Sequence, residues 1–445
     1  MGGKRVPQDP WSGGTLNTLR ANAFPESAIR ARARFGAASA FPDLEQYGRA
    51  LFGADPAEPD TGTYDPLDLL RLVPPIFVPH RLAKLVDLAR EPVYRDVELD
   101  TTVGGFRSTL PLYLSAFGST LSASVDLGLA ASRQAGRLGI VMVIGENVTP
   151  VNGYGRLEDD AERSLLGRIS AYAAHMLDGY GGVVVQQSTE DADAEVWNLV
   201  YSDPNVQPLL TSGRLGFELK VGQGAKPGLG GMTVLDSATA ARLADAFTMD
   251  PVFSTGSGAV LRSSSPGTFT EEILRQQVRL MRNNFPRAKV WVKLPPARDV
   301  AAAAAVAWDA GADAVAVDGA EGGTGWAPLA FLAHVGLPLG ECLRRIGDHP
   351  SCLLVSGRMW EGARVAKCLA LGANAAGLGR AALIAVDTDA ENGLVNLVEC
   401  LSLELQMLSS ALGKYHVGAL APEDVWFPYA AGEGRPVART AEAWH

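Results

Sequence analysis

The feature that most constrains the fold is an alternation of short β-rich runs with longer segments of helical periodicity, which begins near residue 110. Eight such units predict a parallel (β/α)8 TIM barrel of the α/β class. A doubly wound open sheet is the alternative, but it fits less well because no early GxGxxG turn is present. The expected strands are 112–116, 140–144, 183–187, 217–221, 290–294, 314–318, 352–356 and 375–378, and the expected helices include 122–138, 165–177, 270–284, 301–310 and 361–371.

The barrel is expected to occupy residues 110–412, between an N-terminal extension at 1–109 that packs on it and a C-terminal tail at 413–445. In the extension, helices are predicted at 66–73 and 79–90, and a hairpin at 97–108. A further segment, 250–269, interrupts the alternation with seven Ser or Thr and three Gly. A structureless segment of that length is typical of a lid, an insertion or a mobile loop.

Composition excludes several classes of partner. The formal net charge is −10 and no block of Lys or Arg occurs, which disfavours nucleic acid and anionic membranes. The amino terminus lacks the apolar segment of a secretion signal, and no apolar run is long enough to cross a bilayer, so we expect a cytoplasmic protein. The four cysteines are spaced 10, 16 and 32 residues apart, which indicates free thiols rather than a metal site or a disulfide scaffold.

The most informative motif is FELKVGQGAKPGLGGM at residues 217–232, where a short β run opens into a glycine-rich loop around one lysine. Residues at the carboxyl ends of barrel strands face the reaction, so Gln223 and Lys226 are candidates for ligand contact. A plain glycine turn with an exposed lysine is the structural alternative. Lys293 ends another apolar strand and must either reach the barrel mouth or pair with an anion. Glu146 follows a third strand, where a functional acid and a solvated loop acid are both compatible with the sequence.

Small residues at other strand ends predict a cofactor site. A flat ligand could lie against Ser115, Ala116, Gly118 and Ser119, although a tight βα turn would use the same residues. Barrel enzymes commonly bind phosphate on their last loops, through backbone N–H groups and a helix amino end. Two lysines near the mouth together with such loops predict a phosphorylated flat cofactor such as FMN, with Lys293 beside it. The other residues expected to contact it are Gly322, Gly323, Thr324, Ser356, Gly357, Arg358, Gly377, Gly379 and Arg380.

These motifs carry a family resemblance. Residues 217–231, the loop DGAEGGTGWAP at 318–328 and the turns at 356–357 and 377–379 resemble the FMN-binding synthase domain of glutamate synthase, above all its short archaeal-type and stand-alone relatives. The resemblance covers about residues 66–412. It implies a barrel that binds FMN and reduces 2-iminoglutarate, formed from 2-oxoglutarate and ammonia, to L-glutamate. Some relatives instead make N-methylglutamate from methylamine and glutamate.

By position in the motifs, the resemblance implies that Lys293 lies by the flavin, and that Gln223 and Lys226 lie by flavin and substrate. Glu146 matches the acid of the family's GEGG turn, but Asn147 follows it here. The family's iron–sulfur cysteines have no counterpart, because residues 381–396 contain no cysteine, so no Fe-S cluster is expected. A serine-rich stretch at 254–268 replaces the family's histidine-bearing segment.

The sequence therefore predicts an FMN-dependent oxidoreductase that acts on an amino acid, an imino or 2-oxo acid, or a related carboxylated substrate. Lys226, Gln223 and Glu146 are its candidate catalytic residues, and no metal is expected. The alternative is an amine-transferring or redox-inactive subunit of a multi-subunit complex. An electron-donor or amine-donor subunit and a homo-oligomer are the expected protein partners.

Overall fold

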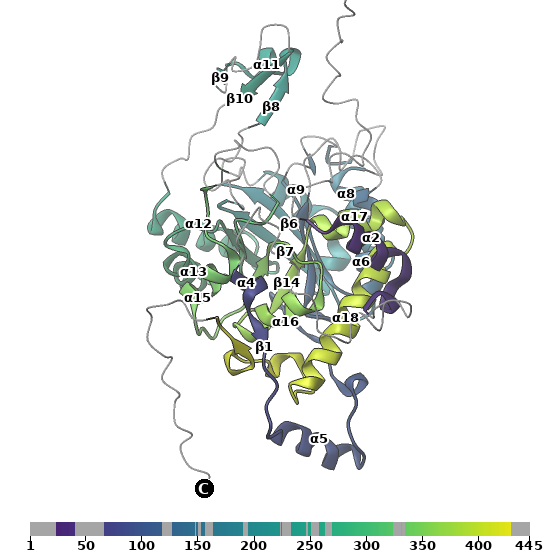
Figure 1. The fold of residues 1–445 in the computed structure, drawn as a ribbon. Helices are drawn as coiled ribbons and strands as arrows, with labels where there is room; N and C mark the ends of the chain where they lie inside the picture. The colour runs from purple at the N-terminus through teal and green to yellow at the C-terminus, as the bar shows by residue number, and fades with distance from the viewer. Residues whose placement is uncertain are drawn as a thin grey trace, which may run out of the picture.

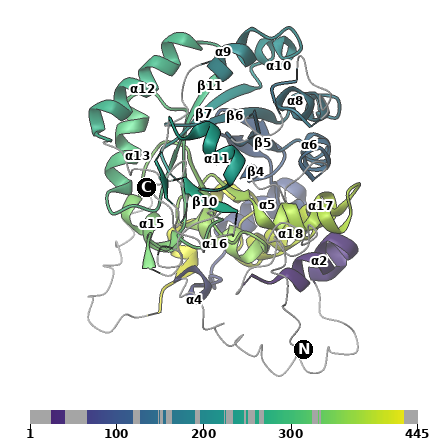
Figure 2. The same ribbon diagram turned by 90° about the horizontal axis from the view of Figure 1, so that it is seen from above.

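Eight parallel strands close into a barrel in the order β11-β12-β13-β14-β4-β5-β6-β7 (Figures 1 and 2). Every predicted strand is present, with its ends shifted by two residues or fewer, so the predicted TIM barrel is confirmed. The strands are β4 (Leu112–Phe117), β5 (Val141–Ile144), β6 (Gly182–Ser188), β7 (Leu215–Lys220), β11 (Lys289–Leu294), β12 (Ala314–Asp318), β13 (Leu353–Ser356) and β14 (Ala375–Leu378). The computed structural model describes residues 24–40, 66–117, 127–146, 148–149, 153–155, 163–189, 195–222, 224, 233–245, 248–250, 258–262, 269–323, 331 and 334–428.

Helices form a ring around the barrel, as Figure 2 shows from above. Local sequence signals mark where two of them begin: the hydroxyl of Thr270 accepts a hydrogen bond from the Ile273 N–H, and that of Ser164 accepts one from the Gly167 N–H. The ring helices are α6 (Leu127–Leu138), α8 (Leu165–Ala173), α9 (Glu195–Ser202), α10 (Gln207–Thr211), α12 (Glu271–Asn284), α13 (Val300–Asp309), α15 (Leu339–Ile346), α16 (Gly362–Ala370), α17 (Arg380–Thr388) and α18 (Gly393–Ala411).

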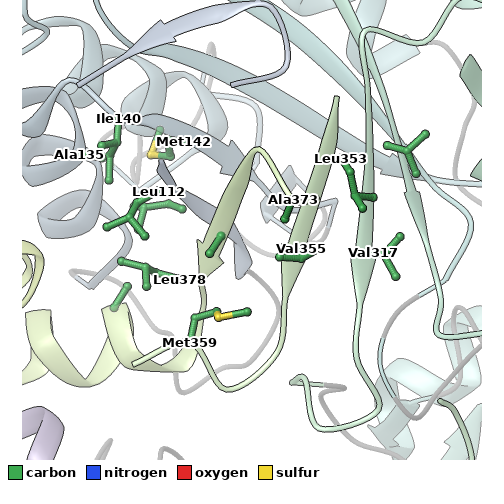
Figure 3. Packing of buried hydrophobic residues seen from close by; sticks show 14 of the residues in the cluster. Leu112, Ala135, Ile140, Met142, Val317, Leu353, Val355, Met359, Ala373 and Leu378 are labelled. Atoms are coloured by element: carbon green, nitrogen blue, oxygen red, sulfur yellow. The ribbon is translucent and has the colours of Figure 1, made fainter. Parts of the chain in front are cut away.

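The main core lies between the barrel wall and the helices (Figure 3). Phe217 of β7 is an example: its ring centroid lies 5.7 Å from that of Trp197 and 4.8 Å from that of Phe285. Because successive side chains along a strand point to opposite faces, residues one and three positions after Phe217 point away from this core. Glu218 and Lys220 therefore face the barrel interior.

A hairpin closes the amino-terminal end of the barrel. It consists of β2 (Thr101–Val103) and β3 (Phe106–Ser108), which confirms the hairpin predicted there. The Trp291 indole inside the barrel donates a hydrogen bond to the Gly104 carbonyl at 2.9 Å and packs edge-on against Phe106. Gly104 has a φ of +56°, and a Cβ there would lie 2.2 Å from the Trp291 ring, so only glycine fits this turn.

The N-terminal residues pack against the last two barrel helices. An unpredicted helix, α2 (Glu26–Phe35), is followed by the short 3-10 helix η1 (Gly36–Ala40). Arg30 of α2 pairs with Asp387 at 2.9 Å, and Arg32 pairs with Glu404 at 2.6 Å. These ion pairs fix α2 on α17 and α18.

The prediction of a helix over residues 66–73 is correct for its first half and wrong for its second half. Helix α4 (Pro66–Leu69) ends early, and β1 (Arg71–Leu72) pairs with β15 (Val425–Trp426) near the other end of the chain. No local pattern reveals a partner strand so far away. The predicted helix at 79–90 is present as α5 (Pro79–Leu88), and the short 3-10 helices η2 (Tyr94–Asp96), η3 (Val417–Ala419) and η4 (Pro422–Asp424) complete these regions.

A small antiparallel sheet with one helix is inserted after β7. It contains β8 (Thr233–Asp236), α11 (Ser237–Leu243), β9 (Met249–Asp250) and β10 (Ala259–Arg262), and it lies at the top of Figure 1. The strand order is β8-β10-β9. The expectation of a structureless segment over 250–269 is therefore wrong at Ala259–Arg262, because backbone pairing with β8 and β9 organises it. In the part of the chain that the structure describes, no helix has the length and apolarity needed to cross a bilayer.

Candidate functional site

The barrel interior is apolar at its amino end and charged at its carboxyl end. Inward-facing residues from the middle of the strands form an apolar floor with the β2–β3 hairpin: Val103, Phe106, Tyr113, Val141, Val143, Val184, Trp291, Ala314, Ala316, Leu354 and Ala375. Beyond this floor, strand ends contribute the polar residues that we call the mouth cluster: Glu146, Gln186, Glu218, Lys220, Lys293, Asp318 and Ser356. The carboxyl end is where TIM barrels carry out their chemistry.

Two buried ion pairs organise the mouth cluster. Lys293 Nζ lies 3.0 Å from Asp318 Oδ2, and the two side chains are only 9% and 5% exposed. Lys220 Nζ lies 2.5 Å from Glu146 Oε1, with both side chains 10% exposed. Lys220 and Lys293 are neighbours across β7 and β11, so each lysine needs its own carboxylate in this dry setting.

Lys293 remains a cation in the folded protein. Burial alone would lower its pKa, but the nearby Asp318 and Glu218 carboxylates outweigh burial and raise it. The Ser356 hydroxyl donates a hydrogen bond to Asp318 from the neighbouring strand and so holds the carboxylate that faces the lysine. The predicted pairing of Lys293 with an anion is thus present. In the same way, Lys220 outweighs burial and lowers the pKa of Glu146.

Glu218 holds its proton to a higher pH than Glu146 does. It accepts a hydrogen bond from Gln186 on the next strand. Burial raises its pKa to about 7; Lys293 opposes this shift, whereas the Asp318 and Glu146 charges add to it. The described mouth cluster contains three carboxyl groups and two lysines. When Glu218 is protonated, the two remaining carboxylates balance the two lysines and the net charge of the cluster is zero.

Glu218→Gln is expected to flatten the pH dependence of stability. The folded protein keeps the Glu218 proton up to a pKa of about 7, whereas an unfolded glutamic acid releases it near about 4.3. Between these values the folded state binds more protons, so its unfolding free energy falls by about 1.4 kcal/mol per pH unit as pH rises. Gln cannot ionise and should lose this slope. Urea unfolding between about pH 5 and 8 measures it, with the exposed Glu195→Gln as control. Equal slopes in wild type and Glu218→Gln would contradict the prediction.

The end of β4 lies beside Gly377 of the neighbouring strand β14, and the cofactor prediction includes residues of both strands. Ser115 is buried and Ala116 follows it at the strand end. A Cβ at Gly377 would lie 2.2 Å from the Ser115 Oγ and 2.6 Å from the Tyr113 ring, so a bare backbone is needed for this approach. The Tyr113 and Ser115 side chains lie side by side, but the Ser115 Oγ has no hydrogen bond of good geometry.

The glycines of the last loops leave backbone accessible, and the two predicted arginines contact the N-terminal segment. Apart from chain neighbours, no described residue places an atom within 4 Å of a Cβ position at Gly323 or Gly379. Arg358 donates to Asp68 at 2.8 Å, and the Arg380 guanidinium lies 5.4 Å from the Phe24 ring centroid. Both arginines therefore contact the N-terminal segment. The remaining predicted residues, Gly118, Ser119, Gln223, Lys226 and Thr324, lie outside the described part of the chain.

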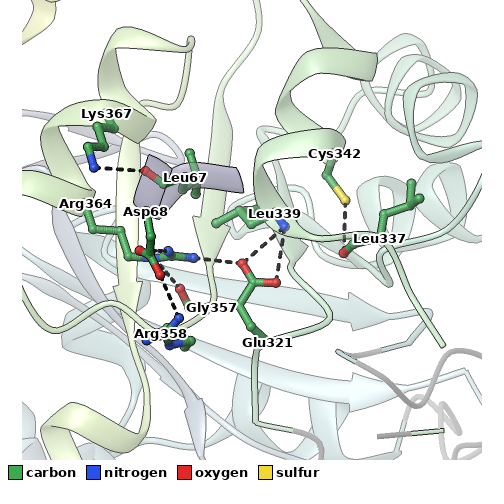
Figure 4. A network of polar contacts seen from close by, with 10 residues as sticks. All are labelled: Leu67, Asp68, Glu321, Leu337, Leu339, Cys342, Gly357, Arg358, Arg364 and Lys367. Carbon is green, nitrogen blue, oxygen red and sulfur yellow. Dashed lines mark hydrogen bonds and ion pairs between the residues drawn. The ribbon is translucent and has the colours of Figure 1, made fainter. Parts of the chain in front are cut away.

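A second buried network supports the loops after β12 and β13 (Figure 4). Arg364 of α16 donates to Glu321 at 2.8 Å, to Asp68 at 3.0 Å and to the Gly357 carbonyl at 3.0 Å. Glu321 also accepts from the Leu339 N–H at 3.2 Å. One guanidinium thereby fixes two mouth loops to each other and to α4. The loop prediction that includes Gly322 and Gly357 did not identify Arg364.

Sequence comparisons identify relatives over much of the barrel. A family model described as "Conserved region in glutamate synthase" matches residues 148–392, more than half of the chain. The archaeal-type glutamate synthase (NADPH) of Thermotoga sp. (strain RQ2) is 35% identical over 178 residues, which covers 38% of this chain and 34% of that protein. The glutamate synthase large subunit-like protein of Rhizobium meliloti (strain 1021) is 28% identical over 328 residues, which covers 61% and 72% respectively. This chain therefore spans only about a third of the Thermotoga relative's length.

Solved structures show the same fold at low identity. A mutant of an active chimera of (S)-mandelate dehydrogenase matches with a TM-score of 0.54 at 18% identity, over 92% of this chain and all of that one. A mandelate oxidase solved with a monooxide FMN adduct matches with a TM-score of 0.50 at 16% identity, over 92% of this chain and 95% of that one. At such identities the likeness establishes the barrel alone. Because the glutamate synthase family model covers more than half of the residues, the chain belongs to the family of the conserved region in glutamate synthase.

Proposed function

We propose that the protein is an FMN-dependent oxidoreductase with its active site at the barrel mouth. The observation that carries the proposal is the buried Lys293–Asp318 pair at the carboxyl end of a closed barrel in a chain of this family. The FMN adduct of the structurally similar mandelate oxidase supports the choice of cofactor. Bound FMN would supply the transfer of a hydride to or from the substrate.

The residues at the mouth suit such a cofactor. The buried Ser115 Oγ has no good hydrogen bond within the described protein and can bind a ring heteroatom. The Lys293 ammonium can hold negative charge at the pyrimidine edge of a flavin, while Asp318 and Ser356 keep the lysine in place. The bare backbone at Gly379, beside the amino end of α17, suits a phosphate, together with Gly322, Gly323 and Gly357.

The substrate proposal rests on the family and on the sequence motif. We propose an amino acid, an imino or 2-oxo acid, or a related carboxylated compound, bound on the side of Glu146, Gln223 and Lys226. The relatives are named as NADPH-dependent synthases or as large subunits, which supports NADPH or a partner subunit as electron donor. Because residues 381–396 carry no cysteine, we propose that electrons reach the flavin without an iron–sulfur cluster. A cytoplasmic homo-oligomer is the expected form.

An absorption spectrum of the purified protein tests the cofactor. We expect the visible absorbance bands of a flavin, and a released flavin that is identified as FMN rather than FAD. Protein that is colourless and does not bind added FMN would refute the proposal. Bound FMN that neither NADPH nor a reduced ferredoxin bleaches would favour the amine-transferring or redox-inactive alternative.

A further inference from the structure

Three arginines are buried in the described part of the chain, and one of them lacks a counter-ion. Arg32 and Arg364 are 8% and 1% exposed, and each donates to buried carboxylates. Arg168 of α8 is 5% exposed, yet its guanidinium has no ion pair or hydrogen bond with another described residue, and its Nε is buried without a partner. A buried guanidinium without an acceptor is unfavourable, so this one differs from the two structural arginines.

The Arg168 guanidinium lies against the first turn of α6. A Cβ at Gly128 would lie 2.5 Å from the Arg168 Cζ and 2.8 Å from its Nε, so the guanidinium occupies the place of a side chain at Gly128. The two helices are neighbours in the ring (Figure 2) and approach closely again where a Cβ at Gly136 would lie 2.5 Å from the Tyr172 carbonyl oxygen. The Gly128 carbonyl already accepts a hydrogen bond from Ser132 at 2.7 Å.

The first turn of α6 adds positive charge to that of the arginine. The first N–H groups of a helix have no acceptor within it, and the helix dipole places partial positive charge there. Burial lowers the pKa of Arg168 to about 10, which leaves it charged at neutral pH. Without a nearby anion, the interaction between the guanidinium and the partial positive charge of the helix end is repulsive. An anion that contacts both the guanidinium and the first N–H groups of the helix would satisfy both sets of donors.

We infer that Arg168 and the amino end of α6 form a binding site for a small oxyanion, a carboxylate or a phosphate. α6 follows β4, so the site lies toward the carboxyl side of the barrel, but outside its wall. It shares no residue with the mouth cluster or with the loops proposed to hold FMN. The inference therefore stands independently of the proposed function.

Titration calorimetry with inorganic phosphate and with succinate tests the inference. The protein carries saturating FMN, or is used as purified if it binds none, and chloride keeps the ionic strength constant. We expect saturable binding of at least one probe, weakened about tenfold or more in Arg168→Met and less in Arg168→Lys, which keeps the charge but loses the fork of donors. The exposed Arg279→Met on α12 is the matched control and should bind as wild type.

The two probes distinguish the source of the anion. Binding of phosphate alone assigns the site to a phosphate, whereas binding of succinate assigns it to a carboxylate. Gly128→Ala provides a second variant if Arg168→Met does not fold, because its methyl group would displace the guanidinium and should also weaken binding about tenfold or more. No saturable binding to wild type, or equal binding to wild type and to the folded variants, would overturn the inference.

Discussion

Lys293→Met is expected to abolish flavin binding and to lower the free energy of unfolding by about 3 to 5 kcal/mol. Among the described residues, the substitution leaves the buried Asp318 with the Ser356 hydroxyl as its side-chain donor, and it removes the cation proposed to face the flavin. Removing one partner of a buried ion pair lowers the free energy of unfolding by more than the intact pair raises it, because the remaining charge is buried without a counter-ion. The flavin-to-protein absorbance ratio and urea unfolding measure the two effects separately.

Lys414→Met is the matched control for Lys293→Met. Lys414 is also buried, and its Nζ lies 3.1 Å from Glu423 and 3.7 Å from Asp424, outside the barrel. It should lose stability but keep the flavin. Combining Lys293→Met with Asp318→Asn should restore much of the stability without restoring the flavin, since the buried charge is gone. Flavin retained by Lys293→Met at wild-type stoichiometry would show that this lysine does not hold the cofactor.

Arg364→Met is expected to destabilise the protein by about 3 to 5 kcal/mol. The side chain is 1% exposed and contacts Glu321, Asp68 and the Gly357 carbonyl. Without it, the buried Glu321 carboxylate loses its guanidinium partner, and the loops after β12 and β13 lose their common support. The midpoint of urea unfolding reports the loss, and a faster release of bound flavin reports the loosened loops.

Two further variants serve as comparisons for Arg364→Met. Arg344→Met removes an exposed pair with Glu341 and should cost less than about 1 kcal/mol. Arg364→Lys should recover little, because a single ammonium cannot reach three acceptors in the geometry of a guanidinium fork. A loss of less than about 1 kcal/mol in Arg364→Met would contradict a central role for this network.

The barrel was predictable because its strands carry their own periodic signal. Apolar runs of five or so residues, such as 314–318, are bounded by turns, and local propensity agrees with the final fold. The alternation in FELK also contained the signal for Glu218 and Lys220, which the sequence reasoning assigned to the strand rather than to the site. Which face of a strand points inward follows from closure of the sheet, and a single strand does not show that closure.

Long-range polar contacts were the part that the sequence could not predict. Arg358 and Arg380 were predicted at a phosphate, and their contacts with Asp68 and Phe24 from the N-terminal segment were not predicted. Arg364 and Asp68 are 296 positions apart, and no local pattern couples them. An arginine near a glycine turn has the same local sequence whether it binds a ligand or another segment of the chain, so only the tertiary fold separates these cases.

The hairpin that seals the barrel floor affects how fast protons move. Trp291 and Phe106 fill the amino-terminal end of the barrel, so we expect a proton that exchanges between Glu218 and bulk water to pass the mouth. A molecule bound at the mouth would therefore block the path of the proton. Glu218 would then keep the protonation state that it had when the molecule bound. Exchange of this proton would then follow the residence time of the occupant rather than the pH of the solution.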